Sequence, residues 1–536
     1  MSRPREGVYV AAAIVLLAFA LRAFPYLSSG VPYHTDTWPQ LANARNLVAS
    51  SPVPLGPGNG FGPYNILWPA DTLFYAVSSV LLGPGPAELM PLLGPLVTSL
   101  MAVLFFALLR SFGIGPRASG VATLLFAVAG GSTMISAGVT KEAFALPLMV
   151  LVVLLLNLWL KDGNKGALGL SAFSFVVLLA AHSLTSVVGF LLCCYLTMAY
   201  ALTPGGRGRV APTVVLLLVF SFLSYLYFYV YAVSSLPYDL QPSGLVSVFA
   251  YEALFTAPVW VAGAFSLDLH RWTAAWLGFL GLGVAGLFAS ALAFHTLLDS
   301  PIVSPYLVAL AVPYLAVALL SSWGMYSARG SPHSRGAVFA SLWALGVLGV
   351  VGFSVFATPG AVGTTMRILD FVYPGVAVLG ALALSKLMGG RRLLAGAGCA
   401  AVLLLVVGSA YVVPYSAYWS GPLGGSQRVY TPAEVSSLAW AGHASSGRTI
   451  YADARFGYLS RYYGGNVSSG PGFYYLAGLQ PLGSGCLIVD SLIAQIGYIG
   501  GTYGHPVNMT VVADLPAQTS LQRVYANGQD TTYCRP

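Results

Sequence analysis

The sequence contains very little charge. Only 7% of its 536 residues are Asp, Glu, Lys or Arg and 57% are hydrophobic, whereas roughly one quarter of a soluble domain is charged. The mean hydropathy is +0.77. No fold in water could bury so much apolar surface, so the composition excludes a soluble globular protein and indicates an integral membrane protein.

The sequence also lacks the patterns of several other classes. Its net charge is +8, but the basic residues stand in pairs between apolar runs and form no basic face, which excludes nucleic acid as a partner. The five cysteines show no metal-ligand spacing, and only Cys486 and Cys534 lie outside apolar runs, so a disulfide between these two is chemically allowed. The first apolar run has no small-residue cleavage site, and we interpret it as a retained span.

Thirteen apolar runs are candidate membrane spans, since a helix needs about 20 residues to cross a bilayer. They lie near 8–27, 89–110, 118–136, 142–160, 166–181, 184–202, 211–233, 246–266, 274–296, 303–322, 337–357, 368–387 and 393–414. With the N-terminus in the cytoplasm, the loops on that side carry Arg3, Arg5, Arg110, Arg117, Lys161, Lys165, Arg207, Arg209, Arg271, Arg329, Arg335, Lys386, Arg391 and Arg392. Only Arg22, Arg45, Lys141 and Arg367 fall elsewhere before residue 415, and the positive-inside rule therefore predicts a cytoplasmic N-terminus.

This threading leaves two long segments on the outer side of the cell membrane, a first loop at 28–88 and a tail at 415–536. We therefore predict a membrane domain at 1–414 and a small extracytoplasmic α/β domain at 415–536. In the tail, Thr431 and Glu434 have the spacing of a helix-capping box, and runs such as CLIVD are typical of short strands. Two glycosylation sequons, at Asn466 and Asn508, agree with an outward location.

Ionisable residues near the outer membrane surface are candidate site residues, because charge is costly there. They come from six loops or span ends: His34, Asp36, Asp71, Lys141, Glu142, His182, Asp239, Glu252, His295, Asp299, Arg367 and Asp370. The sharpest candidate is Asp36, which follows the first span and is flanked by His34 and Trp38. A carboxylate at this boundary suits a general base or a metal ligand. The alternative is that Asp36 caps the helix that follows it.

Three further candidates each have a structural alternative. Lys141 breaks the positive-inside pattern and could meet a lipid phosphate, with Glu142 beside it, although the helix dipole also favours a Glu in the first turn. His182 interrupts a long apolar stretch, either as a site residue or as a turn residue bonded to backbone. Arg367 either grips a phosphate or pairs with Asp370 one turn along the same helix.

Together these features resemble the GT-C superfamily of membrane glycosyltransferases, which includes protein O-mannosyltransferases, aminoarabinose transferases and the catalytic subunit of oligosaccharyltransferase. The resemblance covers most of the chain. Asp36 in HTDTWPQLANARNL occupies the place of an acidic residue that members carry early in the first outer loop, and TKEAFALPL is similar to their entry into the fourth span. In the tail, YADARFG resembles the oligosaccharyltransferase WWDxG segment, but only Asp453 and a displaced Gly457 remain of that motif.

The resemblance implies an all-α polytopic membrane bundle of about 13 transmembrane helices with a small extracytoplasmic α/β domain. It implies transfer of a sugar or glycan from a polyprenyl-phosphate or polyprenyl-diphosphate donor to a glycan, lipid or protein acceptor at the outer membrane face. The residues it points to are Asp36 and Glu142 for catalysis, Arg367, Lys141 and His182 for the donor phosphate, and His34, Trp38 and Asp453 on the acceptor side or in support. Metal dependence stays open, and Asp36 is the ligand if Mg²⁺ or Mn²⁺ is used.

Three rival functions remain open from the sequence. Loss of the WWDxG tryptophans argues against protein N-glycosylation of the oligosaccharyltransferase type, and the same loss keeps open a non-catalytic scaffold. A transporter or lipid flippase would use intramembrane charges as a permeation path. Against that, the ionisable residues gather at the outer boundary of the membrane and the sequence has no internal repeat.

Overall fold

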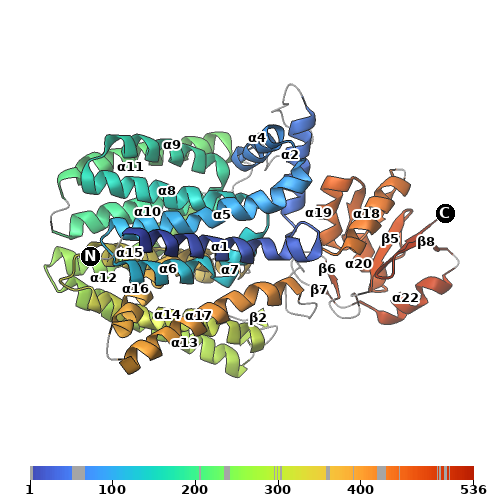
Figure 1. Ribbon diagram of the computed structural model, residues 1–536. Helices are drawn as coiled ribbons and strands as arrows, with labels where there is room; N and C mark the ends of the chain where they lie inside the picture. Colours follow the sequence, from blue (N-terminus) through green and yellow to red (C-terminus); the bar gives the residue numbers. More distant parts are fainter. Residues whose placement is uncertain are drawn as a thin grey trace.

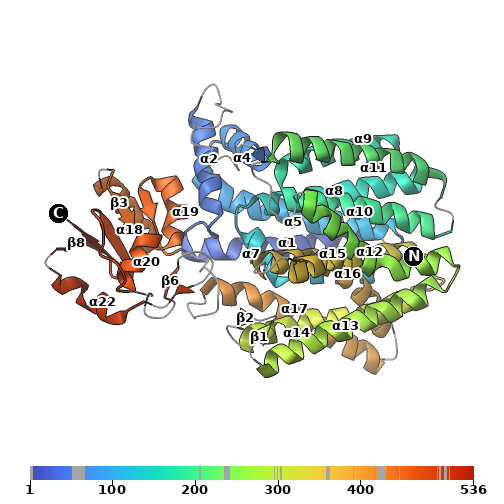
Figure 2. The same cartoon turned by 180° about the vertical axis from the view of Figure 1, so that it is seen from behind.

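The computed structural model describes residues 4–50, 67–204, 207–233, 242–294, 296–297, 300–301, 305–357, 362–389, 392–418, 430–445, 447–491, 493, 497–499, 504–505, 507–518 and 520–535. Long helices run side by side through most of the molecule, and a small domain with a sheet lies at one end of them (Figure 1). The same separation is seen from behind (Figure 2). The candidate residues Asp239, His295 and Asp299 fall outside the described residues.

Sixteen helical segments make up the described part of the membrane domain outside its first outer loop. They are α1 (Pro4–Ser29), α5 (Pro86–Ser111), α6 (Pro116–Ala127), α7 (Gly130–Ala137), α8 (Lys141–Asp162), α9 (Lys165–Ala181), α10 (Ser183–Leu202), η1 (Arg207–Arg209), α11 (Val210–Tyr225), η2 (Leu226–Tyr231), α12 (Pro242–Ala264), α13 (Leu269–Phe294), α14 (Pro305–Ser327), α15 (Ser334–Ala357), α16 (Val362–Met388) and α17 (Arg392–Tyr418). Two antiparallel strands of two residues each, β1 (Thr296–Leu297) and β2 (Ser300–Pro301), follow α13.

Every predicted span coincides with one of these helices, with the pair α6 and α7, or with α11 and the π-helical turn η2 that continues it. Nine helices in the described residues are long and apolar enough to cross a membrane, or ten if α6 and α7, which meet at a 57° bend, form one broken span. The chain is therefore a multi-pass membrane protein. The number of thirteen spans stays a prediction.

The loops predicted to be cytoplasmic meet at one end of the bundle. Lys161 donates from Nζ to the carbonyl oxygen of Ser111 at 3.0 Å, and Arg209 donates to the carbonyl oxygen of Lys161 at 2.8 Å. Arg335 donates to the carbonyl oxygen of Pro204 at 2.8 Å. The N-terminus lies at the end of the bundle far from the small domain (Figure 1). The basic loops thus share one face of the protein.

Helix α16 lies unusually close to its two neighbours. A Cβ at Gly375 of α16 would lie 2.7 Å from the carbonyl oxygen of Ala340 in α15, and a Cβ at Gly324 of α14 would overlap the carbonyl oxygen of Leu379. Small residues at helix contacts permit this approach in membranes. The position of α16, and of Arg367 near its N-terminal end, is therefore fixed by packing against α14 and α15.

Two helices of the first outer loop lie between the bundle and the small domain. They are α2 (Thr37–Ala49) and α4 (Ala70–Leu82). Helix α2 packs on α4 and α5 on one side and on α19 (Ala454–Tyr463) of the small domain on the other (Figures 1 and 2). The first outer loop therefore joins the two parts of the molecule.

The small domain is of the α/β type, as predicted. Besides α19 it contains α18 (Pro432–Ala444), β3 (Thr449–Tyr451), β4 (Asn466–Ser468), α20 (Gly470–Leu476), β5 (Cys486–Asp490), β6 (Tyr498–Ile499), β7 (Gly504–His505), α22 (Met509–Asp514), η5 (Leu515–Ala517), β8 (Gln522–Ala526) and β9 (Asp530–Cys534). Its five-stranded sheet has the order β4-β3-β5-β9-β8, in which β3 is parallel to β4 and β5 and the remaining pairs are antiparallel.

In this domain the predicted capping box is confirmed, and the disulfide that the sequence allowed is formed. Thr431 Oγ1 accepts the backbone N–H of Glu434 at 3.2 Å, and the Glu434 carboxylate accepts the backbone N–H of Thr431 at 2.7 Å, which completes the capping box. Cys486 and Cys534 face each other on adjacent strands and form a disulfide. The capping box closes the start of α18, and the disulfide joins β5 to β9 within the sheet.

Candidate functional site

The acidic residue after the first span faces a cation from the far part of the membrane domain. Oδ2 of Asp36 lies 3.8 Å from Nη2 of Arg367, and 41% and 45% of their side chains are exposed. Asp36 stands at the N-cap position of α2, but its carboxylate makes no capping hydrogen bond. Asp36 therefore does not cap α2 through its side chain, and its role as a base or metal ligand stays a prediction.

Contacts between the first and second outer loops hold Asp36 in place. Thr37 Oγ1 donates to the carbonyl oxygen of Tyr33 at 2.5 Å and accepts the backbone N–H of Val139 at 2.9 Å. His34 has a φ of 78° and lies so close to Gly138 that a Cβ there would be 2.5 Å from the His34 Cβ. Because Gly138 has no side chain, the two loops can pack directly against each other.

The Nδ1 atom of His34 bonds to the backbone of the loop and not to the carboxylate of Asp36. Its Nδ1 accepts the backbone N–H of Asp36 at 3.1 Å, and the same nitrogen lies 3.8 Å from Asp36 Oδ2. A ring nitrogen that accepts an N–H carries no proton to donate, so it forms no hydrogen bond to the carboxylate in this tautomer. His34, which is 3% exposed, is thus a buried positioning residue.

Arg367 forms an ion pair with a residue outside its own helix. Its ion pair reaches Asp36, while Asp370, one turn further along α16, packs over α7, where a Cβ at Gly131 would overlap Asp370 Oδ1. The guanidinium lies near the outer end of α16 and is half exposed. It is therefore available to an anion that approaches from outside the bundle.

Lys141, in contrast, is enclosed with a counter-ion. Its Nζ lies 3.3 Å from Asp71 Oδ1 and donates to the carbonyl oxygen of Trp68. The side chains of Lys141 and Asp71 are 3% and 0% exposed. Thr72 links this pair to α2 by donating to Gln40 Oε1 at 3.0 Å. The contacts of Lys141 are those of a buried structural ion pair between the first outer loop and α8.

His182 forms the turn between α9 and α10 and caps α10. Its Nδ1 accepts the backbone N–H of Thr185 at 3.4 Å and lies 2.8 Å from the Thr185 hydroxyl. Burial, together with the charges of Arg367 and Lys141, lowers the pKa of His182 to about 3. These two cations therefore lie within electrostatic range of the ring. The ring is neutral, and with Nδ1 as acceptor it carries a donor at Nε2.

Glu142 is buried at the same outer end of the bundle. It is 5% exposed in the first turn of α8, whose N-cap, Thr140, accepts the backbone N–H of Ala143 at 3.1 Å. Glu142 follows the Gly138 to Val139 segment that contacts the first outer loop. Glu142 lies in the first turn of α8, where the helix dipole favours a carboxylate, and its catalytic role stays a prediction.

Trp38 anchors the small domain to the first outer loop. It is 2% exposed, and its ring centroid lies 5.8 Å from that of Tyr430, 5.9 Å from that of Tyr462 and 5.7 Å from that of Tyr463. Arg45 of α2 lies over the Tyr462 ring, 4.3 Å from its centroid. Trp38 is enclosed by these rings, so it acts as a packing residue between the two domains.

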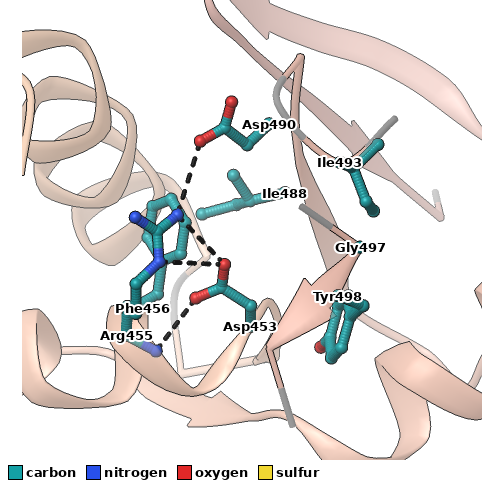
Figure 3. Close-up of a pocket in the computed structure, with 8 residues that line it drawn as sticks. All are labelled: Asp453, Arg455, Phe456, Ile488, Asp490, Ile493, Gly497 and Tyr498. Atoms are coloured by element: carbon teal, nitrogen blue, oxygen red, sulfur yellow. Dashed lines mark hydrogen bonds and ion pairs between the residues drawn. The ribbon is translucent and has the colours of Figure 1, made fainter. Parts of the chain in front are cut away.

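Asp453 lies in a buried ion-pair cluster of the small domain. Figure 3 shows its carboxylate turned towards Arg455, beside a cavity of about 10 Å³ that has room for about one water molecule. Arg455 Nη2 lies 3.2 Å from Asp453, 3.5 Å from Asp490 and 2.7 Å from Glu434. Asp453 also caps α19 by accepting the backbone N–H of Arg455 at 2.9 Å. These contacts give Asp453 a structural role at the start of α19.

The structure adds one residue that the sequence did not single out. Tyr458 of α19 is 40% exposed. Burial of the rest of its side chain raises the pKa of its hydroxyl, Asp36 raises it further, and Arg367 lowers it. Tyr458 therefore lies within electrostatic range of both charges of the pair. The only signal in the sequence is the aromatic run GYLSRYY, which does not indicate which ring faces the membrane domain.

A metal centre is not formed by the residues that the structure describes. Among them, no group of three or more His, Cys, Asp or Glu side chains could hold a metal ion. Mg²⁺ is commonly bound by one or two protein carboxylates together with waters and substrate phosphates, so metal dependence, with Asp36 as the ligand, stays a prediction.

Comparison with known proteins identifies the fold. No family model and no curated protein matches the chain. The arabinofuranosyltransferase AftD from Mycobacteria aligns with 99% of this chain at 14% identity and a TM-score of 0.51, and the alignment covers 40% of AftD. ArnT from Cupriavidus metallidurans, solved with bound undecaprenyl phosphate, aligns over 99% of this chain and 98% of its own at 14% identity and a TM-score of 0.44. The predicted resemblance is thus confirmed for the fold, and the chain has the architecture of a GT-C membrane glycosyltransferase.

Proposed function

We propose that the protein is a membrane glycosyltransferase that moves a sugar or glycan from a polyprenyl-phosphate or polyprenyl-diphosphate donor to an acceptor at the outer membrane face. The observation that carries this proposal is the pair of Asp36 and Arg367, a carboxylate and a guanidinium 3.8 Å apart and both half exposed. A base for the acceptor and a cation for the leaving phosphate are the two groups that this transfer requires.

Two features support an outward location of this pair. The basic loops that bond to one another, through Lys161, Arg209 and Arg335, lie at the other end of the bundle, and clustered basic loops are cytoplasmic in most membrane proteins. The small domain beside the pair carries the disulfide between Cys486 and Cys534, and disulfides persist in oxidising compartments. The N-terminus is then cytoplasmic and the small domain extracytoplasmic.

In the proposed transfer, Asp36 and Arg367 act at different steps. Asp36 accepts the proton of the acceptor hydroxyl or amide, and the acceptor atom forms a new bond to the anomeric carbon of the donor sugar. The bond from that carbon to the phosphate oxygen breaks, and the leaving lipid phosphate keeps the electron pair. Arg367 offers the leaving oxygens a planar fork of N–H donors. The negative charge that develops on the phosphate is thus stabilised where it forms.

An apolar groove near the pair of Lys141 and Asp71 suits the isoprenoid chain of such a donor. It has a volume of about 310 Å³ and lies between the end of α9 and the α11–η2 segment, with Leu179 and Tyr227 in its wall. The Tyr227 hydroxyl donates to the carbonyl oxygen of Leu67 at 2.7 Å, and the next carbonyl, of Trp68, accepts from Lys141. The groove is therefore connected through two adjacent residues to the pair of Lys141 and Asp71.

The other candidate residues take supporting roles in this proposal. His182, neutral and within range of Arg367, offers Nε2–H to the donor phosphate as an uncharged donor. Lys141 and Asp71 fix the first outer loop to α8, and Glu142 adds a buried carboxylate at the same end of that helix. The charge of the leaving phosphate is assigned to Arg367, and no step is routed through a metal ion.

The test is transfer of a radiolabelled sugar by the full-length protein in proteoliposomes. Synthetic polyprenyl-phosphate and polyprenyl-diphosphate sugars are the donors, and membrane extracts supply the glycan, lipid and protein acceptors. Transfer that depends on the protein supports the proposal, and its persistence or loss with a chelator decides whether a metal ion is required. Absence of transfer with every donor contradicts the proposal and favours the transporter or scaffold functions.

A further inference from the structure

The small domain contributes a side chain to the outer face of the site. Helix α19 packs on α2, and Tyr462, Tyr463 and Tyr430 surround Trp38 at centroid distances of 5.7 to 5.9 Å. Tyr458 precedes Tyr462 by four residues, so both lie on the same face of α19. The face that holds the small domain against α2 therefore also presents Tyr458.

Tyr458 differs from its aromatic neighbours in being open to solvent. It is 40% exposed, whereas Trp38 is 2% exposed and Tyr430 is 1% exposed. The charges of Asp36 and Arg367 both act on its hydroxyl. Tyr458 therefore combines an exposed ring with a place on the helix that packs against α2, which begins directly after Asp36.

We propose that Tyr458 is an acceptor-binding residue of the site and that its ring stacks on a sugar, so that the acceptor is a saccharide. A pyranose or furanose ring presents faces of C–H groups bordered by hydroxyls, and an exposed phenol matches this surface with an apolar ring and a polar tip. An acceptor sugar that lies on Tyr458 has its hydroxyls turned towards Asp36, which is the base of the proposed transfer. The inference rests on the proposed function for the identity of that base.

Other residues of α19 do not offer the same platform. Tyr462 lies beneath Arg45, whose guanidinium carbon is 4.3 Å from the ring centroid, and it also packs on Trp38 and Tyr463. Arg455, one turn before Tyr458, is 1% exposed and is held by Glu434, Asp453 and Asp490 (Figure 3). The helix is therefore anchored on either side of Tyr458, which fixes the position of its exposed ring relative to α2.

Two substitutions of Tyr458 distinguish the contribution of its ring to acceptor binding from that of its hydroxyl. Tyr458→Ala removes both, and we expect the acceptor KM to rise roughly three- to tenfold while the donor KM stays within twofold of wild type. Tyr458→Phe keeps the stacking ring, so its acceptor KM stays close to wild type. The matched control is Tyr474→Ala, because Tyr474 is 45% exposed on α20 of the same domain. An acceptor KM unchanged in Tyr458→Ala, or a rise equal to that in Tyr474→Ala, would overturn the inference.

A binding measurement keeps this test independent of transfer. Saturation-transfer NMR on the detergent-solubilised full chain, with a panel of soluble arabino-, manno- and gluco-oligosaccharides, reports which sugar protons touch the protein. We expect contacts in wild type and Tyr458→Phe that weaken in Tyr458→Ala and persist in Tyr474→Ala. If the protein shows this pattern of sugar contacts but transfers no sugar, the result supports sugar binding at Tyr458 and contradicts the proposed function. Contacts that are insensitive to Tyr458, or that occur with no sugar, would overturn the inference alone.

Discussion

Asp36 and Arg367 come from the first outer loop and from the outer end of α16, and their Oδ2 and Nη2 atoms lie 3.8 Å apart. Neither residue has a local reason to be there. Asp36 forms no capping hydrogen bond with α2, and the ion pair of Arg367 bypasses Asp370 on its own helix. The proposed transfer uses this pair, with Asp36 as the base and Arg367 as the group that binds the leaving phosphate.

Arg367 is predicted to bind the donor phosphate. Loss of a charge-assisted hydrogen bond costs about 1.5 to 3 kcal/mol, so we expect Arg367→Ala to weaken binding of a polyprenyl phosphate by roughly ten- to a hundredfold. Arg367→Lys keeps the positive charge but lacks the planar fork of N–H donors. We therefore expect its affinity for the lipid to lie between those of wild type and Arg367→Ala. Native mass spectrometry of the purified protein with titrated lipid measures the affinity. Arg329→Ala is the control, since Arg329 is exposed and pairs with Asp268 elsewhere, and equal affinities in all variants would contradict the assignment.

Lys141 and Asp71 are predicted to act as a structural pair. Removal of one partner leaves a buried charge unpaired, which costs about 3 to 5 kcal/mol, so Asp71→Asn should lower the melting temperature markedly. The double variant Lys141→Met with Asp71→Leu should recover most of that loss, because it removes both buried charges. The affinity of the double variant for the lipid-linked donor then distinguishes the two roles of Lys141. A stable double variant that binds the donor like wild type supports the structural role. A stable double variant that no longer binds the donor shows that the charge of Lys141 contributes to donor binding.

Much of the membrane domain is predictable from the sequence because apolar length alone locates its helices. The spans predicted near 142–160 and 337–357 coincide with α8 and α15 to within a few residues. The bend between α6 and α7 was not predicted, although Gly130 and Gly131 at that point are a helix-breaking signal within the run at 118–136. The spacing of Thr431 and Glu434 in the sequence was enough to predict their capping box, because both partners lie within one helical turn.

The site residues were predictable one by one, but their partners were not. Nothing in the sequence indicates that Arg367 meets Asp36, or that Lys141 is neutralised by Asp71, because these pairs form between distant segments. The same limit applies to Tyr458, whose exposure depends on how α19 docks on α2. Trp38 and Asp453 carried a family expectation, and packing instead gives each a contact that stabilises the small domain.

The stability of the small domain is predicted to fall as pH rises. Burial, together with the nearby Asp490, raises the pKa of Asp530 from 3.8 to about 7. Between about pH 4 and 7 the folded domain keeps this proton while the unfolded chain releases it, so the free energy of unfolding decreases across that window. The decrease is on the order of 2 to 4 kcal/mol.

Hydrogen exchange of the full chain in detergent at pH 5 and pH 8 measures this effect, after correction for intrinsic exchange rates. Asp530→Asn should reduce the difference between the two pH values, because the amide does not titrate. Asp514→Asn, at an exposed carboxylate of α22, should leave the difference as in wild type. Protection in strand β9 that increases towards pH 8 would contradict the prediction.

The most direct test of the site is sugar transfer in proteoliposomes by wild type, Asp36→Asn and Asp268→Asn. Asn keeps the shape of the side chain and removes the base, so Asp36→Asn should lose at least about a hundredfold in transfer rate while its donor affinity stays near wild type. Asp268→Asn alters an ion pair with Arg329 away from the site and should transfer like wild type. Wild-type rates in Asp36→Asn would contradict the assignment of Asp36 as the base, and with it the account of this site.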